Sequence, residues 1–303
     1  EWSGRNDGPG PEHARWHSTI DTASGPTADA VHLIGFASDE GVERNGGRQG
    51  AAKGPAALRA ALGSLAVHEQ RKLIDAGTVT TQDDDLETAQ REVSDRVRDL
   101  VAAQGSAGMT VVLGGGHETS FATHRGAYEA LGPMQVINFD AHFDLRTADR
   151  PTSGTPFRQI AELVGDDFDY SVFGISRPNN TKVLFDTAEQ LGVTTVLDTE
   201  LAAMTVREAA ERALTAVEGD LPIHLSIDLD VLPAAVAPGV SAPAGFGVDY
   251  AALRAMVAAV ASTGRVALLD VVELNPEFDV DNRTAKAAAR LIDDAVVGAT
   301  GRR

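Results

Sequence analysis

Aspartate or histidine occupies every second position in two short segments that each follow an apolar run. In an extended chain, residues two positions apart project to the same side, so each set of side chains converges on one face. Carboxylates gathered at the end of a buried strand cost free energy unless cations neutralise them. The spacing therefore predicts a metal site rather than solvated loop residues. The alternating residues are Asp140, His142 and Asp144 in NFDAHFDLR (138–146) and Asp228 and Asp230 in SIDLD (226–230).

A third segment, GGGHE, follows another apolar run and adds His117. By itself, a run of glycines at this place indicates a tight turn, because neither the GxGxxG nor the Walker A spacing of a phosphate loop is present. Together the three segments supply four Asp and two His side chains. Carboxylate oxygens with some imidazole favour Mn²⁺, with Mg²⁺, Fe, Co and Zn as alternatives, and four carboxylates balance the charge of two divalent ions.

The chemistry that such a site supports is hydrolysis. Two divalent ions roughly 3.5 to 4 Å apart hold one bridging water, lower its pKa and present hydroxide to an electrophile. The chain has no cysteine and no GxSxG segment, so neither a thiol nor a nucleophile-elbow serine competes with this interpretation.

The elements that must position these residues are short apolar strands that alternate with amphipathic stretches. Most of the strands are continuous apolar runs, as is typical of a parallel sheet with both faces covered. About eight β–α alternations result, which predicts either a doubly wound open sheet or a (β/α)8 barrel. In an open sheet, ligands bind beyond the carboxyl ends of the strands, where all three segments lie. The predicted strands are 31–36, 71–77, 109–115, 134–140, 170–175, 193–197, 222–230 and 266–274.

Helical patterns occupy the intervals between the strands, and no internal repeat or linker divides the chain. We predict an irregular N-terminal arm over residues 1–28 and one domain over 29–303, because α/β proteins of this length often form a single sheet. The predicted helices are 54–63, 84–103, 118–131, 156–164, 180–191, 205–218, 249–263 and 284–297.

The overall charge restricts the partners of the protein. The formal net charge is −18, a balance that repels nucleic acid and anionic lipid. No apolar run approaches the roughly 20 residues of a membrane span, and no signal peptide is visible. We therefore expect a cytoplasmic protein that acts on a small molecule, without nucleic-acid or membrane partners. An anionic substrate would require arginines gathered locally at the site.

The segments GGGHE, DAHFD and SIDLD make the chain resemble the ureohydrolase superfamily of arginases and agmatinases over about residues 30–297. The resemblance implies a three-layer α/β/α fold around a mainly parallel eight-stranded sheet, two Mn²⁺ ions per subunit, and a homo-oligomer that is either a trimer or a hexamer. It also implies how the ligands divide. One ion is expected to bind His117, Asp140, Asp144 and Asp228, and the other Asp140, His142, Asp228 and Asp230.

Five segments, one of which is again GGGHE, narrow the resemblance to the formimidoylglutamase branch of this superfamily. They are GGGHE, HFDLR, SGTPFRQI, GISRPNNT and RNGGRQGAAKGP. Enzymes of this branch hydrolyse N-formimidoyl-L-glutamate to L-glutamate and formamide in histidine degradation. The chain departs from arginases at Leu232, where they usually have Asp, and at Phe157, where they have a His that shuttles protons. One alternative is a guanidino-acid hydrolase or agmatinase-like enzyme that releases urea, and a second is a metal-binding scaffold without activity or an interaction protein on the same fold. A third, a dinucleotide-binding α/β enzyme built on Gly114 to Gly116, is disfavoured because the fingerprint spacing is missing.

The resemblance also implies roles for residues around the metals. Glu273 is expected to grip the formimino group while metal-bridging hydroxide attacks its carbon, and Asp144 is expected to pass a proton to the leaving nitrogen. The substrate carries two carboxylates, which planar guanidinium groups bind bidentately. The residues expected to contact this dicarboxylate amidine are Arg146, Ser153, Arg177, Asn180, Arg44 and Arg48.

Overall fold

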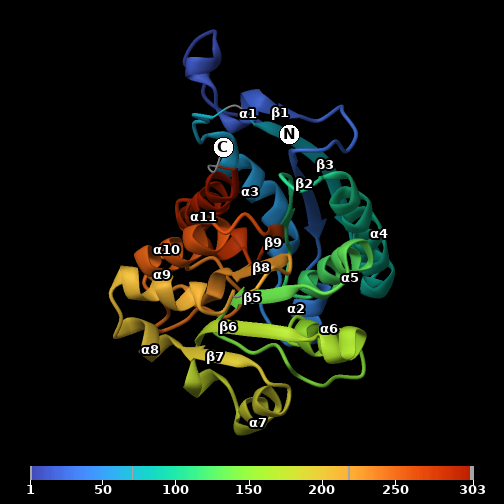
Figure 1. The fold of residues 1–303 in the computed structure, drawn as a ribbon, viewed down its shortest axis with the longest axis vertical. Coiled ribbons are helices and arrows are strands. Elements are labelled where there is room, and N and C mark those ends of the chain that lie inside the picture. The colour runs from blue at the N-terminus through green and yellow to red at the C-terminus, as the bar shows by residue number, and fades with distance from the viewer. Residues whose placement is uncertain (1, 70, 218, 301–303) are drawn as a thin grey trace.

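The computed structural model of the protein describes residues 2–69, 71–217 and 219–300, and a single parallel sheet runs through them (Figure 1). The strands are β1 (Ile20–Asp21), β2 (Ala30–Ala37), β3 (Lys72–Thr80), β4 (Met109–Leu113), β5 (Gln135–Phe139), β6 (Asp169–Ile175), β7 (Thr194–Leu197), β8 (Ile223–Asp228) and β9 (Val266–Val272). Their order across the sheet is β1-β3-β2-β4-β9-β8-β5-β6-β7, and every neighbouring pair is parallel.

Helices cover both faces of this sheet. One layer contains α3, α11, α10 and α9, which pack in that order, and α4, α5 and α6 pack together in the other layer (Figure 1). No helix within the described residues is long and apolar enough to cross a membrane. The helices are α1 (Trp16–Thr19), α2 (Glu40–Arg44), α3 (Gly54–Gly63), α4 (Leu86–Ala103), α5 (Thr119–Leu131), α6 (Pro156–Val164), α7 (Lys182–Gln190), α8 (Asp198–Ala202), α9 (Val206–Leu214), α10 (Tyr250–Ala261) and α11 (Arg283–Thr300).

Local signals explain where several helices begin. Pro55 lies in the first turn of α3, where its missing N–H would have no partner inside the helix. The Asp85 side chain accepts a hydrogen bond from the N–H of Thr88 and caps α4. Thr205 and Glu208 form a capping box at the start of α9. These short-range rules are the reason that the predicted helices agree with the observed ones to within a few residues.

The three-layer α/β/α fold is confirmed, and the barrel alternative is wrong because β1 and β7 are free edges of an open sheet. Within the part of the chain that the structure describes, the sheet has nine strands rather than eight. The additional strand is β1, in which Ile20 pairs with Leu73 of β3. A strand of two residues is too short to produce a recognisable alternation, and it lies within the segment predicted to be an irregular arm. The division of the chain at residue 28 stays a prediction.

Four strands at the middle of the sheet position the predicted site. β4, β9, β8 and β5 are consecutive neighbours, and because all are parallel their carboxyl ends meet at one edge. The GGGHE segment follows β4, the DAHFD segment follows β5, and SIDLD ends β8. Their central apolar residues, such as Val111, Ile137 and Leu225, are fully buried, so the strand ends are held by a packed core on each side.

Candidate metal centre

Close packing shapes the turn after β4, which carries His117. A Cβ atom on Gly115 would overlap the backbone carbonyl of Ser38, and one on Gly116 would overlap the side chain of Glu118. The three glycines therefore allow the turn to lie directly against the neighbouring segment, which agrees with the tight-turn interpretation of GGGHE.

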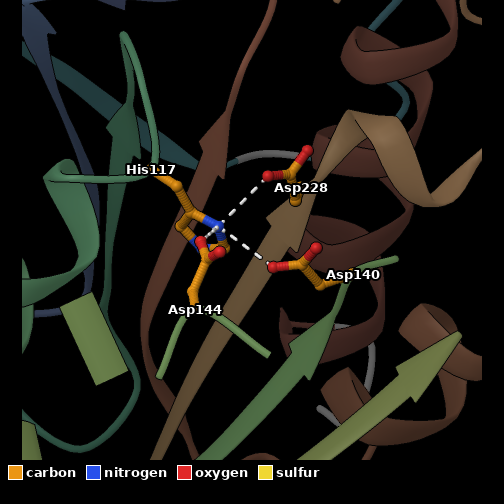
Figure 2. Close-up of side chains that lie close together, drawn as sticks. All are labelled: His117, Asp140, Asp144 and Asp228. Carbon is orange, nitrogen blue, oxygen red and sulfur yellow. Dashed lines mark ion pairs between the residues drawn. The ribbon is translucent and has the colours of Figure 1, made fainter. Parts of the chain in front are cut away.

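The first group of candidate ligands surrounds the imidazole of His117. Its Nδ1 atom lies 2.9 Å from Asp144 Oδ2 and 3.1 Å from both Asp140 Oδ2 and Asp228 Oδ2 (Figure 2). One ligand atom from each of the four residues lies within 4.8 Å of every other. All four side chains are buried or nearly so. The structure brings together the four residues that were expected to bind the first ion.

The second group is built around His142 and shares Asp140 with the first. His142 Nδ1 lies 3.0 Å from Asp230 Oδ2 and 3.6 Å from Asp140 Oδ1. These three residues form a second set of clustered ligand atoms. Asp228 directs Oδ2 toward His117, and its Oδ1 accepts a hydrogen bond from the N–H of Asp230 at 2.8 Å. The bridging role of Asp228 between the two ions therefore stays a prediction.

Burial and the charges of neighbouring residues shift the pKa values of the residues in this cluster. Burial, followed by the charge of Asp140, raises the pKa of Asp144 to about 6. The charge of Asp230 raises the pKa of His142 to about 12, although burial opposes the shift. Burial, followed by the charge of Asp230, also raises the pKa of Asp228. The cluster favours added positive charge, either protons or a metal cation that replaces them.

The hydrogen bonding of His117 fits a cation. Its Nδ1 atom is buried and, within the part of the chain that the structure describes, makes no hydrogen bond although three carboxylates surround it. On the other side of the ring, Nε2 lies 3.1 Å from Ser226 Oγ. A proton on Nε2 leaves on Nδ1 a lone pair that points at the carboxylates, an arrangement that a bound positive charge stabilises. The residues present therefore fit a divalent metal ion with oxygen and imidazole ligands.

A cavity of about 330 Å³ borders both ligand groups. Its volume is that of a site for a small molecule. Its lining combines five predicted metal ligands with polar and charged side chains from several loops. The residues that line the cavity include His117, His142, Asp144, Asp228, Asp230, Glu273, Arg48, Arg146, Ser153, Asn180, Asn45 and Ser241.

Glu273 follows β9 directly and lines this cavity. Its φ of 68° lies in the left-handed region, which is uncommon outside glycine and is concentrated at functional sites. Oε1 accepts a hydrogen bond from the N–H of His117 at 2.8 Å, whereas Oε2 is buried and has no partner among the described residues. Burial, followed by the charge of Glu118, raises the pKa of Glu273. One carboxylate oxygen anchors the side chain, and the other is free to accept an N–H of a ligand.

Two of the four predicted arginines line the cavity. Among the described residues, the Arg146 side chain makes no hydrogen bond or ion pair, and it is exposed. Arg48 is half-buried, donates to the carbonyls of Ser241 at 3.1 Å and Val240 at 2.5 Å, and lies 3.9 Å above the ring of Phe278. No carboxylate of the described chain forms an ion pair with either guanidinium, so both charges are available to an anion.

The other two arginines do not reach the cavity. Arg44 forms ion pairs with Glu40 and Glu87 and also donates to the carbonyls of Asp84 and Pro151. Its guanidinium is fully engaged in holding neighbouring segments together. Arg177 is exposed and lies outside the cavity lining. The expected substrate contacts of these two residues have no support in the geometry.

Ser153 and Asn180 line the cavity in different ways. Ser153 Oγ accepts a hydrogen bond from Asn45 Nδ2 at 3.2 Å and keeps its own proton for a ligand. Asn180 Nδ2 donates to the carbonyls of Ala141 and Ser176, both at 2.9 Å, so it supports the backbone that carries the ligands. The sequence interpretation missed Asn45, which lies between the two arginines weighed in RNGGRQG, and Ser241, whose loop carries no chemical pattern.

Phe157 occupies the position where arginases place a proton-shuttling His. It is fully buried, its ring centroid lies 5.2 Å from that of His117, and it stacks on Tyr170 at 4.4 Å. This part of the site is an apolar wall beside the first ligand group.

Comparison with known proteins agrees with this geometry. A model of the arginase family matches residues 29–298. A formimidoylglutamase from Corynebacterium efficiens is 49% identical over 296 residues, which cover 97% of this chain and 93% of the relative. Formiminoglutamase from Trypanosoma cruzi with Mn²⁺ has a similar structure, with a TM-score of 0.82, 31% identity, and coverage of 91% of this chain and 95% of that one. Formimidoylglutamase from Bacillus subtilis, at 24% identity, supports the fold alone, with a TM-score of 0.86 over 95% of this chain and 92% of that one.

These matches confirm the resemblance to formimidoylglutamases and the arginase-like fold that the sequence predicted. The family match spans every strand that carries a candidate ligand, from β4 to β9, and the relatives match nearly the full length of the chain. By its sequence, its fold and the residues gathered at its central strand ends, the chain belongs to the arginase family.

Proposed function

We propose that this protein hydrolyses N-formimidoyl-L-glutamate to L-glutamate and formamide, with two Mn²⁺ ions per subunit. The observation that carries the proposal is that one cavity is bordered by a cluster of Asp and His ligands and, among the described residues, by a buried carboxylate oxygen without a partner and by two arginines without carboxylate partners. The names of the relatives support the choice of substrate, and the Mn²⁺ in the Trypanosoma cruzi structure supports the choice of metal.

The metal ligands are proposed on the basis of the two clusters. His117, Asp140, Asp144 and Asp228 would hold one ion, and Asp140, His142 and Asp230 the other, with Asp228 as a further bridge. A pair of divalent ions bound there lowers the pKa of water and so supplies a nucleophile at neutral pH. The four carboxylates balance the charge of two such ions, so Glu273 is the group that attracts a cationic formimino group.

Glu273 orients the group that is attacked. Its free Oε2 accepts an N–H of the cationic formimino nitrogen, while the bond from His117 N–H to Oε1 holds the carboxylate in place. This contact fixes the formimino carbon beside the ligand groups and stabilises positive charge on its nitrogen. The deep burial of Glu273 strengthens the attraction because little water screens it.

Arg146 and Arg48 bind the two carboxylates of the substrate. The two carboxylates are repelled by a protein of net charge −18, so local positive charge is needed at the cavity. The absence of protein carboxylates on both guanidinium groups within the described chain leaves them free for this role. Ser153 donates its hydroxyl proton to the substrate backbone.

Asp144 passes a proton to the leaving nitrogen. It lines the cavity beside His117, so it is placed to take a proton from the attacking water and pass it on. Phe157 makes a contribution of a different kind, because its apolar ring keeps water from the far side of His117.

A product assay separates this function from its alternatives. Protein loaded with Mn²⁺ is supplied with N-formimidoyl-L-glutamate, agmatine, arginine or guanidinobutyrate, and formamide, glutamate and urea are measured. We expect formamide and glutamate from the first substrate only. Urea from guanidinobutyrate or agmatine would assign the protein to a urea-releasing branch, and turnover of none of these by metal-replete protein would favour an inactive scaffold.

We also propose a homo-oligomer, either a trimer or a hexamer, and a cytoplasmic location. The oligomer rests on the family resemblance, and the location rests on the composition of the sequence, which contains no cysteine. The measured mass in solution by light scattering tests the first, and fractionation of the source cells tests the second.

A further inference from the structure

A buried hydrogen-bond network continues from His117 into the core of the sheet, and the proposed reaction does not use it. Ser226 Oγ lies 3.1 Å from His117 Nε2 and 3.2 Å from Ser120 Oγ. Ser120 Oγ in turn lies 3.1 Å from Asp270 Oδ1. The side chains come from β8, α5 and β9, and the serines and Asp270 are 0% exposed. Burial of a carboxylate in the centre of the core costs free energy unless the carboxylate is hydrogen-bonded and has a counter-charge.

The other oxygen of Asp270 is fully satisfied. Oδ2 lies 2.8 Å from Thr123 Oγ1 and 2.7 Å from His224 Nε2. His224 Nδ1 is 3.1 Å from Nδ1 of His124, which is also buried. Burial alone would raise the pKa of Asp270, but the charge and hydrogen bond of His224 bring it below its ordinary value. The network therefore ends on an ionised carboxylate whose imidazole partner, His224, lies on the side away from the metal ligands.

The carboxylate gives this network one direction. An ionised carboxylate only accepts, so Ser120 directs its single hydroxyl proton to Asp270. Ser120 Oγ can then only accept a hydrogen bond from Ser226. This bond uses the single hydroxyl proton of Ser226. Ser226 Oγ is left as an acceptor toward the ring, and His117 Nε2 must donate to it. The proton is thereby fixed on Nε2, and the lone pair is left on Nδ1, the atom that faces three carboxylates.

We propose that Asp270 is a positioning residue for the metal site: acting through Ser120 and Ser226, it fixes the proton of His117 on Nε2 and reserves Nδ1 for a metal ion. A neutral side chain at position 270 would allow the hydroxyl groups of Ser120 and Ser226 to reverse the direction of their hydrogen bonds. Ser226 would then donate to Nε2, and the remaining ring proton would lie on Nδ1, where the metal must bind. The inference rests on the metal-binding part of the proposed function.

The test is the Mn²⁺ affinity of metal-stripped protein, measured by equilibrium dialysis with metal quantification. Asp270→Asn keeps the shape of the side chain and removes its charge, and we expect its Mn²⁺ dissociation constant to rise by about 10- to 100-fold. Thr123→Val is the matched control, because it removes a hydroxyl that donates to the same carboxylate but lies off the route to His117. Its dissociation constant should equal that of the wild type.

A double-mutant cycle identifies the route. Ser226→Ala removes the acceptor of His117 Nε2, so adding Asp270→Asn in that background should change the affinity far less than in the wild type. Equal effects in both backgrounds would overturn the inference, as would an unchanged affinity in Asp270→Asn. If Asp270→Asn does not fold, Ser120→Ala interrupts the same route, and unchanged binding by that variant would refute the proposal. Wild-type protein that binds no Mn²⁺ would instead contradict the proposed function itself.

Discussion

Two clusters of charged residues involve the loop that carries Arg146 and Ser153, because Asp144 directly precedes this loop and Arg150 lies on it. The clusters differ in what neutralises their carboxylates. In the metal centre, Asp140, Asp144 and Asp228 face the imidazole of His117, and no Arg or Lys of the described residues forms an ion pair with them. The pKa of Asp144 rises to about 6, because burial and a neighbouring carboxylate oppose its charge.

The second cluster, which we call the arginine clasp, consists of Glu87, Arg44 and Arg150. Glu87 accepts hydrogen bonds at 3.0 to 3.2 Å from both arginines on both of its oxygens. Hydrogen bonds from Arg150 and Arg44 lower the pKa of Glu87 to about 2, although burial opposes the shift. A carboxylate whose counter-charge the protein supplies is structural, whereas carboxylates left without one form a site for an external cation.

Removal of the ligand shared by both metal groups should have the largest effect. Asp140→Asn keeps the size of the side chain but removes the charge that both His117 and His142 face. We expect Mn²⁺ affinity to fall by more than the roughly 100-fold that is typical when a partner outside the ligand shell is changed, with loss of turnover. Metal content and hydrolysis measured on the same preparation check this, and stoichiometric Mn²⁺ in the variant would contradict it.

Comparison of two arginines separates substrate binding from surface charge. Arg146→Ala should raise KM for N-formimidoyl-L-glutamate by about 10- to 100-fold, the loss expected for a hydrogen bond to a charged group, with a smaller change in kcat. Arg177→Ala is the matched control, because Arg177 is exposed and outside the cavity lining. Its KM should equal that of the wild type. A larger KM effect at Arg177 than at Arg146 would reverse our assignment of the two residues.

The arginine clasp should affect stability rather than chemistry, and by the smallest amount. Glu87→Gln is expected to lower the free energy of unfolding at pH 7 by about 1 kcal/mol, because the ion pairs are partly exposed. The folded-state pKa is lowered from 4.5 to about 2, so this stabilisation is fully present above pH 4.5 and disappears as the pH falls through 2. Urea unfolding of metal-free protein at several pH values measures the difference between the variant and the wild type.

Glu162→Gln serves as the control for this measurement. Glu162 pairs with one arginine, Arg158, in an exposed contact along α6. Its substitution should leave the unfolding free energy nearly unchanged at every pH. A difference for Glu87→Gln that stayed constant down to pH 2 would mean that the charge of Glu87 does not carry its contribution.

Short sequence patterns were sufficient to predict which Asp and His side chains the structure brings together. Alternation along an extended segment places Asp140, His142 and Asp144 on one side, and parallel strands bring their carboxyl ends to one edge of the sheet. The first rule acts over a few residues, whereas the second requires the strands to be parallel neighbours in one sheet. Glu273 was instead expected from the family resemblance, and its place directly after the last strand puts it at the same edge of the sheet.

The roles of the arginines depend on partners far away in the chain. Arg44 and Arg48 lie four positions apart in one segment, yet Arg44 is bound to Glu87, which is 43 residues further along. Nothing near Arg44 in the sequence signals that partner, so its engagement appears only in the folded structure. The strand β1 was missed for a related reason, since its two residues are ordered by pairing with β3 rather than by a pattern of their own.

The place of the four site-bearing strands has a consequence for how the protein loses its metal. They are the innermost members of the sheet, with two or more strands beyond them on each side. Local unfolding of the edge strands β1 and β7, where stability is lowest, leaves the two groups of candidate metal ligands intact. Loss of bound Mn²⁺ during denaturation should therefore coincide with collapse of the entire sheet, which makes metal release a reporter of global unfolding.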